Sequence, residues 1–140
     1  MKDKLVQASE FAFRLNAHSG VPVYRQLIDQ VLSAVALGIL RAGDQLPTVR
    51  QVAVDLAINP NTVMRAYREM EIRRILDTQQ GAGTFVAEPA AEAPIEERAR
   101  QMTQLVSEFV TRAGSLGFTI EELMQALRDL QQGEEPRRKA

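Results

Sequence analysis

Three side chains of one short stretch, Asn61, Thr62 and Arg65, have the chemistry that base edges and phosphates require. An Asn amide pairs with adenine through two hydrogen bonds, an Arg guanidinium pairs with guanine in the same way, and a Thr hydroxyl bonds to a base or a phosphate. Residues 60–73 have helical apolar spacing, which places these side chains in the first turns of a helix. Arg50, in the first turn of a preceding helix, is expected to reach the same groove or strand. The pattern predicts contact with duplex DNA, and a solvated helix face is the alternative.

The residues that most enzymes and metal sites require are scarce. The sequence has 140 residues, no Cys and one His. Without Cys, a disulfide framework, a thiolate zinc site and a cysteine nucleophile are excluded. His18 lies next to Ser19 with no third partner implied, and the pairs Glu96–Glu97 and Glu121–Glu122 suit helix N-termini, where the helix dipole favours negative charge. The sequence therefore predicts no catalytic residue, no metal and no cofactor, and the protein is not expected to be an enzyme.

The charge of the chain is almost balanced but unevenly distributed. Lys and Arg number 17 and Asp and Glu 18, for a net charge of −1. Residues 47–76 contain five arginines and three carboxylates, a local charge of +2, whereas the residues after Pro89 contain seven basic and nine acidic groups, a local charge of −2. A mildly basic DNA-binding segment and an acidic C-terminal part fit this distribution. The alternative is a protein–protein adaptor without DNA binding, which the near-zero net charge supports.

The elements before the predicted DNA-contacting helix follow from apolar spacing and helix-start signals. Residues 11–15 alternate apolar and polar side chains, which predicts a short strand. A first helix is predicted with Pro22 at its first position and an end near Gly38. A second begins at Thr48, whose hydroxyl caps it, and Gln51 completes a capping-box pattern.

The third helix and a hairpin complete the N-terminal part. Asn59 is predicted to cap the third helix, Pro60 to be its first residue and Tyr67 to lie in the core. Two β-prone runs around a corner at Gln80–Gly83 predict a hairpin. Helix, short helix, turn, helix and hairpin is the order of a winged helix-turn-helix, with a recognition helix over about 60–73 and a wing over about 76–86. The predicted fold is mostly α with a small β-wing, followed by a C-terminal two-helix hairpin.

A linker separates the predicted winged helix from two further helices. Residues 88–94 contain two prolines and no large apolar side chain, and a rigid surface turn is the alternative. The predicted divisions are a DNA-binding domain over 1–87, a linker over 88–94, a two-helix region over 95–131 and a disordered tail over 132–140.

The two C-terminal helices share one apolar face. The first has a heptad seam that begins at Ile95, and the second begins with a Thr119–Glu122 capping box, with Phe118 and Leu123 placed for a hydrophobic staple. An isolated helical hairpin would expose this face, so isologous pairing with a second copy is predicted. Folding back onto the chain's own winged helix is the alternative. The residues predicted to form the dimer interface are Ala99, Met102, Val106, Phe109, Ala113, Leu123 and Leu127.

Four segments of the sequence resemble the GntR family of bacterial transcription regulators. They are Pro22–Leu27, Gly43–Arg50, Asn59–Val63 and Gly81–Val86, and the resemblance covers residues 13–86. The Asn-Pro-Asn-Thr-Val string and the short two-helix C-terminal part resemble the YtrA subfamily, which has no large effector-binding domain.

The resemblance implies a homodimeric DNA-binding regulator, most simply a repressor of its own operon and of adjacent ABC transporter genes. Its partner would be double-stranded DNA, a near-palindromic operator with GT…AC half-site ends. Whether a small-molecule effector binds is left open. The DNA contacts implied are Thr48 (phosphate), Arg50 (base or phosphate), Asn59, Asn61, Thr62 and Arg65 on the helix pair, and Gln80 and Gly81 at the wing tip.

The sequence departs from the family pattern at three positions. Many relatives have Arg or Lys where this chain has Pro60 and Met64, so base recognition is expected to differ. Where relatives have Gly at the end of the recognition helix, this chain has Arg74. A left-handed cap there costs Arg on the order of 1 kcal/mol, so either Arg74 adopts it under strain or the helix ends differently.

Targeting signals are not apparent in the sequence. The first ten residues have no apolar core, so no signal peptide is expected, and the longest apolar run, 34–37, is too short to span a membrane. The cytoplasm is the expected compartment, with no membrane partner.

Overall fold

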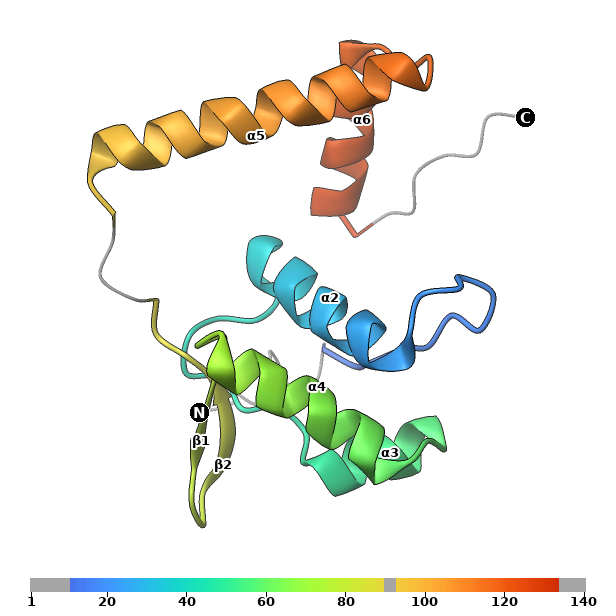
Figure 1. Cartoon of the computed structure of the whole chain (residues 1–140), viewed down its shortest axis with the longest axis vertical. Coiled ribbons are helices and arrows are strands. Elements are labelled where there is room, and N and C mark those ends of the chain that lie inside the picture. The colour runs from blue at the N-terminus through green and yellow to red at the C-terminus, as the bar shows by residue number, and fades with distance from the viewer. Residues whose placement is uncertain (1–10, 90–92, 134–140) are drawn as a thin grey trace. The chain divides into compact units, whose positions relative to one another are not determined.

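The computed structural model describes residues 11–89 and 93–133, and the chain divides into two compact units between Ala90 and Ala91. In the described residues the N-terminal unit contains α2 (Val23–Ala36), α3 (Val49–Leu56), α4 (Pro60–Ile72), β1 (Leu76–Gln79) and β2 (Gly83–Val86) (Figure 1). The C-terminal unit contains α5 (Ile95–Ser115) and α6 (Ile120–Gln131). The mostly helical fold with a small β-wing is the one that the sequence predicts.

Some predicted segments lie partly outside the described residues. The predicted linker 88–94 includes the division between the units, but its residues 90–92 are not among those described. The same is true of 134–140 in the predicted tail and of 1–10 in the predicted DNA-binding domain.

The core of the N-terminal unit forms around α4. Both α2 and α3 pack against α4, and so does β1. One face of α4 is buried at helical spacing, which leaves the opposite face free for other contacts. Tyr67 is buried as predicted, and its hydroxyl donates a 2.6 Å hydrogen bond to the Pro47 carbonyl. The side chains of this core that are almost wholly buried are Leu27, Ile28, Val31, Leu40, Val63 and Met70.

The wing is a two-stranded antiparallel hairpin whose base belongs to the core. Its register runs from Leu76 opposite Val86 to Gln79 opposite Gly83. Leu76 and Val86 are buried, whereas the residues toward the tip are exposed or half-buried. The Leu46 N–H donates to the Thr84 carbonyl at 2.8 Å, which joins β2 to the segment before α3.

The predicted strand at residues 11–15 is wrong. The segment has no ladder partner among residues 11–89 and 93–133, although its side chains alternate as the period of two predicts, with Phe13 buried and its neighbours on either side exposed. Its backbone is paired with a side chain of α2 instead: the Arg14 N–H donates to Gln30 Oε1 at 2.7 Å, and Gln30 Nε2 donates to the Arg14 carbonyl at 2.6 Å. An amide side chain thus satisfies the backbone groups that a neighbouring strand would otherwise satisfy.

Helix starts agree with the sequence in most details. The side chains of Thr48 and Asn59 cap α3 and α4 as predicted. Pro22 is the residue before α2 rather than its first residue. The capping box of α3 is only half formed, because Gln51 Nε2 donates to Asp55 Oδ1 at 2.7 Å instead of returning to the cap. One turn of helix places those two side chains side by side, and their hydrogen bond competes with the box.

Arg74 adopts the left-handed conformation, which decides between the two possible ends of α4. Its φ is +60°, and its N–H donates to the Glu71 carbonyl at 3.0 Å while the Ile75 N–H donates to the Met70 carbonyl at 2.8 Å. These two bonds define a Schellman motif, whose left-handed position glycine usually occupies. Ala57, at the end of α3, has a φ of +54°. The helix ends are therefore regular, and L-residues occupy both left-handed positions.

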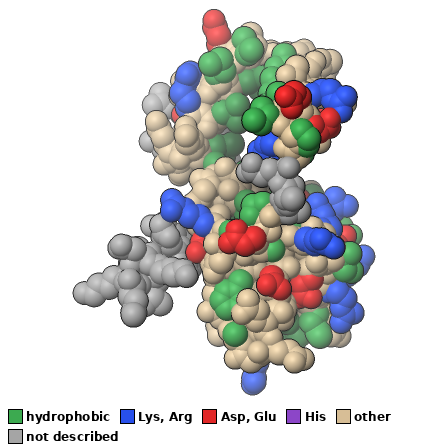
Figure 2. All heavy atoms as spheres, turned by 90° about the vertical axis from the view of Figure 1, so that its left-hand side faces the viewer, with side chains coloured by type: hydrophobic (Ala, Val, Ile, Leu, Met, Phe, Trp, Pro, Cys, Tyr) green, Lys and Arg blue, Asp and Glu red, His purple; other side chains and the backbone are tan. Residues whose placement is uncertain are grey.

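The C-terminal unit consists of α5 and α6, with apolar side chains at its surface, and α6 turns away from the end of α5 instead of packing along it (Figure 1). The Thr119–Glu122 capping box begins α6 as predicted. Of the α5 seam, Met102, Val106 and Phe109 are exposed by 59%, 49% and 47%, whereas Ala113 is buried. Green apolar side chains are visible on the surface of this unit in the upper part of Figure 2. In the described part of the chain, no helix is long and apolar enough to cross a bilayer.

Candidate nucleic-acid interface

The starts of α3 and α4 are fixed by side chains that accept hydrogen bonds from their own helices. Thr48 Oγ1 accepts from the Gln51 N–H at 3.1 Å, and Asn59 Oδ1 accepts from the Asn61 N–H at 2.8 Å. Both capping residues are exposed. Their oxygens satisfy one N–H of each first turn, and the other free N–H groups add positive potential that favours phosphate.

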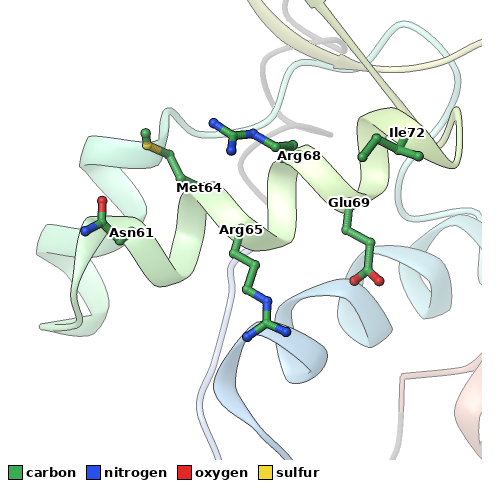
Figure 3. Close-up of a pocket in the computed structure, with 6 residues that line it drawn as sticks. All are labelled: Asn61, Met64, Arg65, Arg68, Glu69 and Ile72. Carbon is green, nitrogen blue, oxygen red and sulfur yellow. The ribbon is translucent and has the colours of Figure 1, made fainter.

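One face of α4 is exposed except at Glu69, which is half-buried. Its residues follow the helical repeat, opposite the buried face, and form an open depression (Figure 3). Figure 3 shows Met64 and Arg68 projecting from one side of this face, whereas Arg65 extends toward α2. The residues that line the depression, here called the α4 face, are Asn61, Met64, Arg65, Arg68, Glu69 and Ile72.

Arg65 stacks on an aromatic ring of the neighbouring helix. Its Cζ atom lies 3.9 Å from the centroid of the Tyr24 ring, and Tyr24 is half-buried on α2. At this distance the guanidinium interacts with the negative face of the ring. Arg65 is therefore oriented by α2 as well as by its own helix.

The arginines on this side of the unit have no carboxylate partner among the described residues. Among the residues that the structure describes, Arg50, Arg65 and Arg68 form no ion pair, and all three are exposed. Their charges are not neutralised within the fold, so this side of the unit is suited to an anionic partner.

The wing tip is positioned by two polar contacts. Thr78 Oγ1 on β1 donates to Glu71 Oε1 on α4 at 2.7 Å, and Gln45 Nε2 donates to the Ala82 carbonyl at 3.2 Å. Gly81, at the tip, has a φ of +78°, which glycine adopts without strain. The hairpin is thus fixed to the end of α4 and to the segment before α3.

The structure brings most, but not all, of the predicted DNA contacts together. Thr48, Arg50, Asn59, Asn61 and Arg65 are exposed around the starts of α3 and α4, and Thr62 is half-buried beside them. The wing residues Gln80 and Gly81 are exposed but lie at the tip of the hairpin, which follows the opposite end of α4 (Figure 1).

Sequence reasoning missed three of the residues that shape this surface. Tyr24, Gln45 and Arg68 are not among the DNA contacts that the sequence predicts. Tyr24 and Gln45 contact residues 41 and 37 positions away, and no local spacing reveals such contacts. For Arg68 the helical repeat was the available signal.

Comparison with known proteins identifies the family. Residues 23–86, which span α2 to β2, match the family model described as bacterial regulatory proteins, gntR family. The HTH-type transcriptional regulator YhcF of Bacillus subtilis (strain 168) is 38% identical over 116 residues, which cover 82% of this chain and 94% of YhcF. The chain belongs to the GntR family.

The similarity to GntR proteins extends beyond the winged helix. The HTH-type transcriptional repressor YtrA of Bacillus subtilis (strain 168) is 31% identical over 117 residues, 84% of this chain and 90% of YtrA. A solved structure, a transcriptional antiterminator from Listeria monocytogenes EGD-e, has a TM-score of 0.64 and 28% identity, and covers 86% of this chain and 90% of its own. These alignments are longer than the N-terminal unit, Met1–Ala90, so they include part of the α5–α6 unit. The chain is a YtrA-like GntR transcription regulator with a winged-helix DNA-binding domain.

Proposed function

We propose that this regulator is a homodimeric repressor that binds a near-palindromic operator, with α4 in the major groove and the β1–β2 hairpin as a wing. The observation that best supports it is the α4 face, which starts at a capped N-terminus and includes Arg65 and Arg68 without carboxylate partners among the described residues. A helix of about 10–12 Å diameter fits the major groove of B-DNA, about 12 Å wide.

The roles of the individual residues follow from their positions. The side chains at the start of α4 meet base edges first when such a helix enters the groove, which gives Asn61 and Thr62 base contacts. At the start of α3, Arg50 is assigned to a base or a phosphate. Thr48, which precedes it, is assigned to a phosphate. Asn59 contributes through the start of α4, and Gln80 and Gly81 contact the backbone or the minor groove from the wing tip.

The unit formed by α5 and α6 is proposed as the dimer interface. Its exposed seam is the feature that supports this, because exposed apolar faces of this kind usually bind another protein surface. A two-fold interface would present two α4 helices to two half-sites about one helical turn apart. The domain limits proposed from the sequence, 1–87, 88–94 and 95–131, assign DNA binding and dimerisation to separate units.

Repression is proposed because the similar protein YtrA is named a repressor. The targets proposed are those that the YtrA resemblance implies, the chain's own operon and adjacent ABC transporter genes. A small-molecule effector is not assigned.

Selection of bound duplexes from random DNA with the full-length chain tests DNA recognition. We expect a two-fold symmetric motif with half-sites about 10 base pairs apart, and an affinity that falls with salt. Asn61→Ala should cost about 1–3 kcal/mol per half-site and relax selection at one base position. Arg112→Ala, which removes a charge from α5 outside the winged-helix unit, is the matched control and should leave the motif unchanged.

Failure to enrich any motif, together with no binding to the gene's upstream region at low salt, would contradict DNA recognition. That outcome would favour the adaptor, whose support is the near-zero net charge of the chain. Charged side chains of both signs share the visible face of the N-terminal unit in the lower part of Figure 2.

Sedimentation equilibrium tests the dimer separately. We expect a dimer for the wild type, a monomer for Phe109→Glu, and a dimer for Thr111→Glu, which places the same charge on the opposite side of α5. A monomeric wild type at micromolar concentration would refute the interface. Folding back of α5 and α6 onto the chain's own winged helix would then be the better account of the seam.

A further inference from the structure

The contact between Tyr24 and Arg65 joins two helices at one edge of the α4 face. Tyr24 is the second residue of α2, Arg65 lies in the second turn of α4, and the Cζ-to-centroid distance is 3.9 Å. The Tyr24 ring is half-buried and packs against the core of the unit, but Arg65 is exposed and the buried side chains of α4 face elsewhere, so the core does not account for the position of the guanidinium. The contact therefore calls for another explanation than core packing.

Stacking restrains the guanidinium without using its hydrogen-bond donors. The group is planar, its five N–H bonds lie in the plane, and a ring below it contacts only one face. A carboxylate partner would occupy these donors, but no described residue pairs with Arg65 in that way. The result is a cation held over the ring, and its donors have no carboxylate partner among the described residues and can bind an oxygen of another molecule.

The direction of the side chain indicates which oxygen that is. In Figure 3 Arg65 leaves the α4 face toward α2, whereas Met64 and Arg68 project from the other side. When a helix fills the major groove, the side chains along its middle meet base edges, and those at its borders meet the sugar–phosphate strands that limit the groove. Arg65 lies at such a border.

We propose that Tyr24 is a positioning residue that holds the Arg65 guanidinium for a phosphate oxygen at the edge of the major groove. This inference rests on the proposed insertion of α4 into DNA, and it chooses the phosphate for Arg65, for which the sequence leaves a base or a phosphate open. Base selectivity then depends on Asn61 and Thr62 and on the side chains that project from the other side of the face, Met64 and Arg68.

Binding measurements on the full-length chain with the selected operator duplex and a scrambled duplex test this role. Arg65→Ala should weaken binding to both duplexes by the same factor, about 10-fold per bound protomer. It should also lower the slope of log K against log salt by about one per protomer. Tyr24→Leu should weaken both by about 2- to 5-fold, and Tyr24→Phe, which keeps the ring, should bind like the wild type.

The coupling between the two side chains separates positioning from a general structural effect. In the Arg65→Ala background, Tyr24→Leu should have no further effect, whereas in the matched Arg68→Ala background it should retain its full 2- to 5-fold loss. NMR on the free protein gives a second readout that does not depend on DNA. The side-chain protons of Arg65 should show an upfield ring-current shift that Tyr24→Phe retains and Tyr24→Leu abolishes.

Three results would overturn the inference. Equal losses from Tyr24→Leu with and without Arg65 would show that Tyr24 acts on binding by another route. A loss from Arg65→Ala confined to the operator would make Arg65 a base contact. Absence of binding by the wild type to either duplex at low salt would overturn the proposed function as well, whereas the first two leave it intact.

Discussion

Replacing Arg74 with glycine is expected to stabilise the winged-helix unit. The φ of Arg74 is +60°, a conformation that costs an L-residue about 1–2 kcal/mol and costs glycine nothing. Glycine loses about 0.5–1 kcal/mol more backbone entropy on folding, which offsets part of the gain. The Arg74 side chain is exposed and forms no ion pair among the described residues, so little is lost with it. The net gain in the free energy of unfolding is about 0.5–1 kcal/mol.

Tyrosine fluorescence during urea unfolding measures the stability of the N-terminal unit, which contains Arg74. The chain has two tyrosines and no tryptophan, and both, Tyr24 and Tyr67, lie in the N-terminal unit. Thermal unfolding should agree, since 1 kcal/mol shifts the midpoint by about 4–8 °C in a domain of this size. The full-length chain is suitable, because α5 and α6 contain no tyrosine.

Arg74→Ala is the matched control for the glycine variant. It removes the same charge and the same side chain but keeps the Cβ atom that causes the strain, so its stability should stay within about 0.5 kcal/mol of the wild type. The difference between Gly and Ala at this position isolates the backbone effect. Equal stability of the two variants, or a less stable glycine variant, would refute the assignment of strain to the end of α4.

Three other substitutions probe contacts elsewhere in the two units. Tyr67→Phe leaves the Pro47 carbonyl without its partner and should cost about 1–3 kcal/mol in urea unfolding. Burial raises the pKa of Tyr67 above that of an unfolded tyrosine, near 10. The wild type should therefore lose stability as the pH rises above 10, because the unfolded chain loses the Tyr67 proton first, and Tyr67→Phe should not show this loss. Gly83→Ala would place a Cβ atom 2.5 Å from Gln45 Nε2 on a residue with a φ of +130°, and it should lower the free energy of unfolding by about 1–3 kcal/mol. Adding Gln45→Ala should restore only the part of this loss that is due to the contact, and thermal unfolding measures both effects. Thr119→Ala removes the capping box of α6, so it should lower the helical circular dichroism signal and destabilise the C-terminal unit by about 1 kcal/mol. An unchanged midpoint of thermal unfolding would contradict this.

The parts of the fold that the sequence predicted are those set by residues a few positions apart. Asn59 and Pro60 define the start of α4 because a capping oxygen and a fixed φ act within one turn. The two strands pair around a three-residue turn, 80–82, for the same reason, although Gly83 of the predicted corner belongs to β2. The prediction of a strand at 11–15 was wrong because a period of two shows which side chains face the core but not which groups pair with the backbone. In this segment the side chain of Gln30 pairs with the backbone of Arg14.

The candidate site was predictable as a surface but not as a set of oriented groups. The helical repeat alone places Asn61 and Arg65 on the exposed face of α4. The orientation of Arg65 depends on a ring 41 residues away, and the position of the wing depends on Gln45, 37 residues from Ala82. Such contacts arise from tertiary packing, which no sequence period records.

The near-neutral chain constrains how a regulator of this kind reaches selectivity. Non-specific DNA binding grows with the number of phosphates neutralised, and the segment 47–76 supplies a local charge of only +2. A weak non-specific background makes each correctly placed contact count for more, because specificity is the ratio of the two affinities. The phosphate contact proposed for Arg65 over Tyr24 raises both affinities alike, so the ratio must come from the base-facing side chains of α4. Pairing two such units through α5 and α6 would then multiply a few good contacts without adding charge.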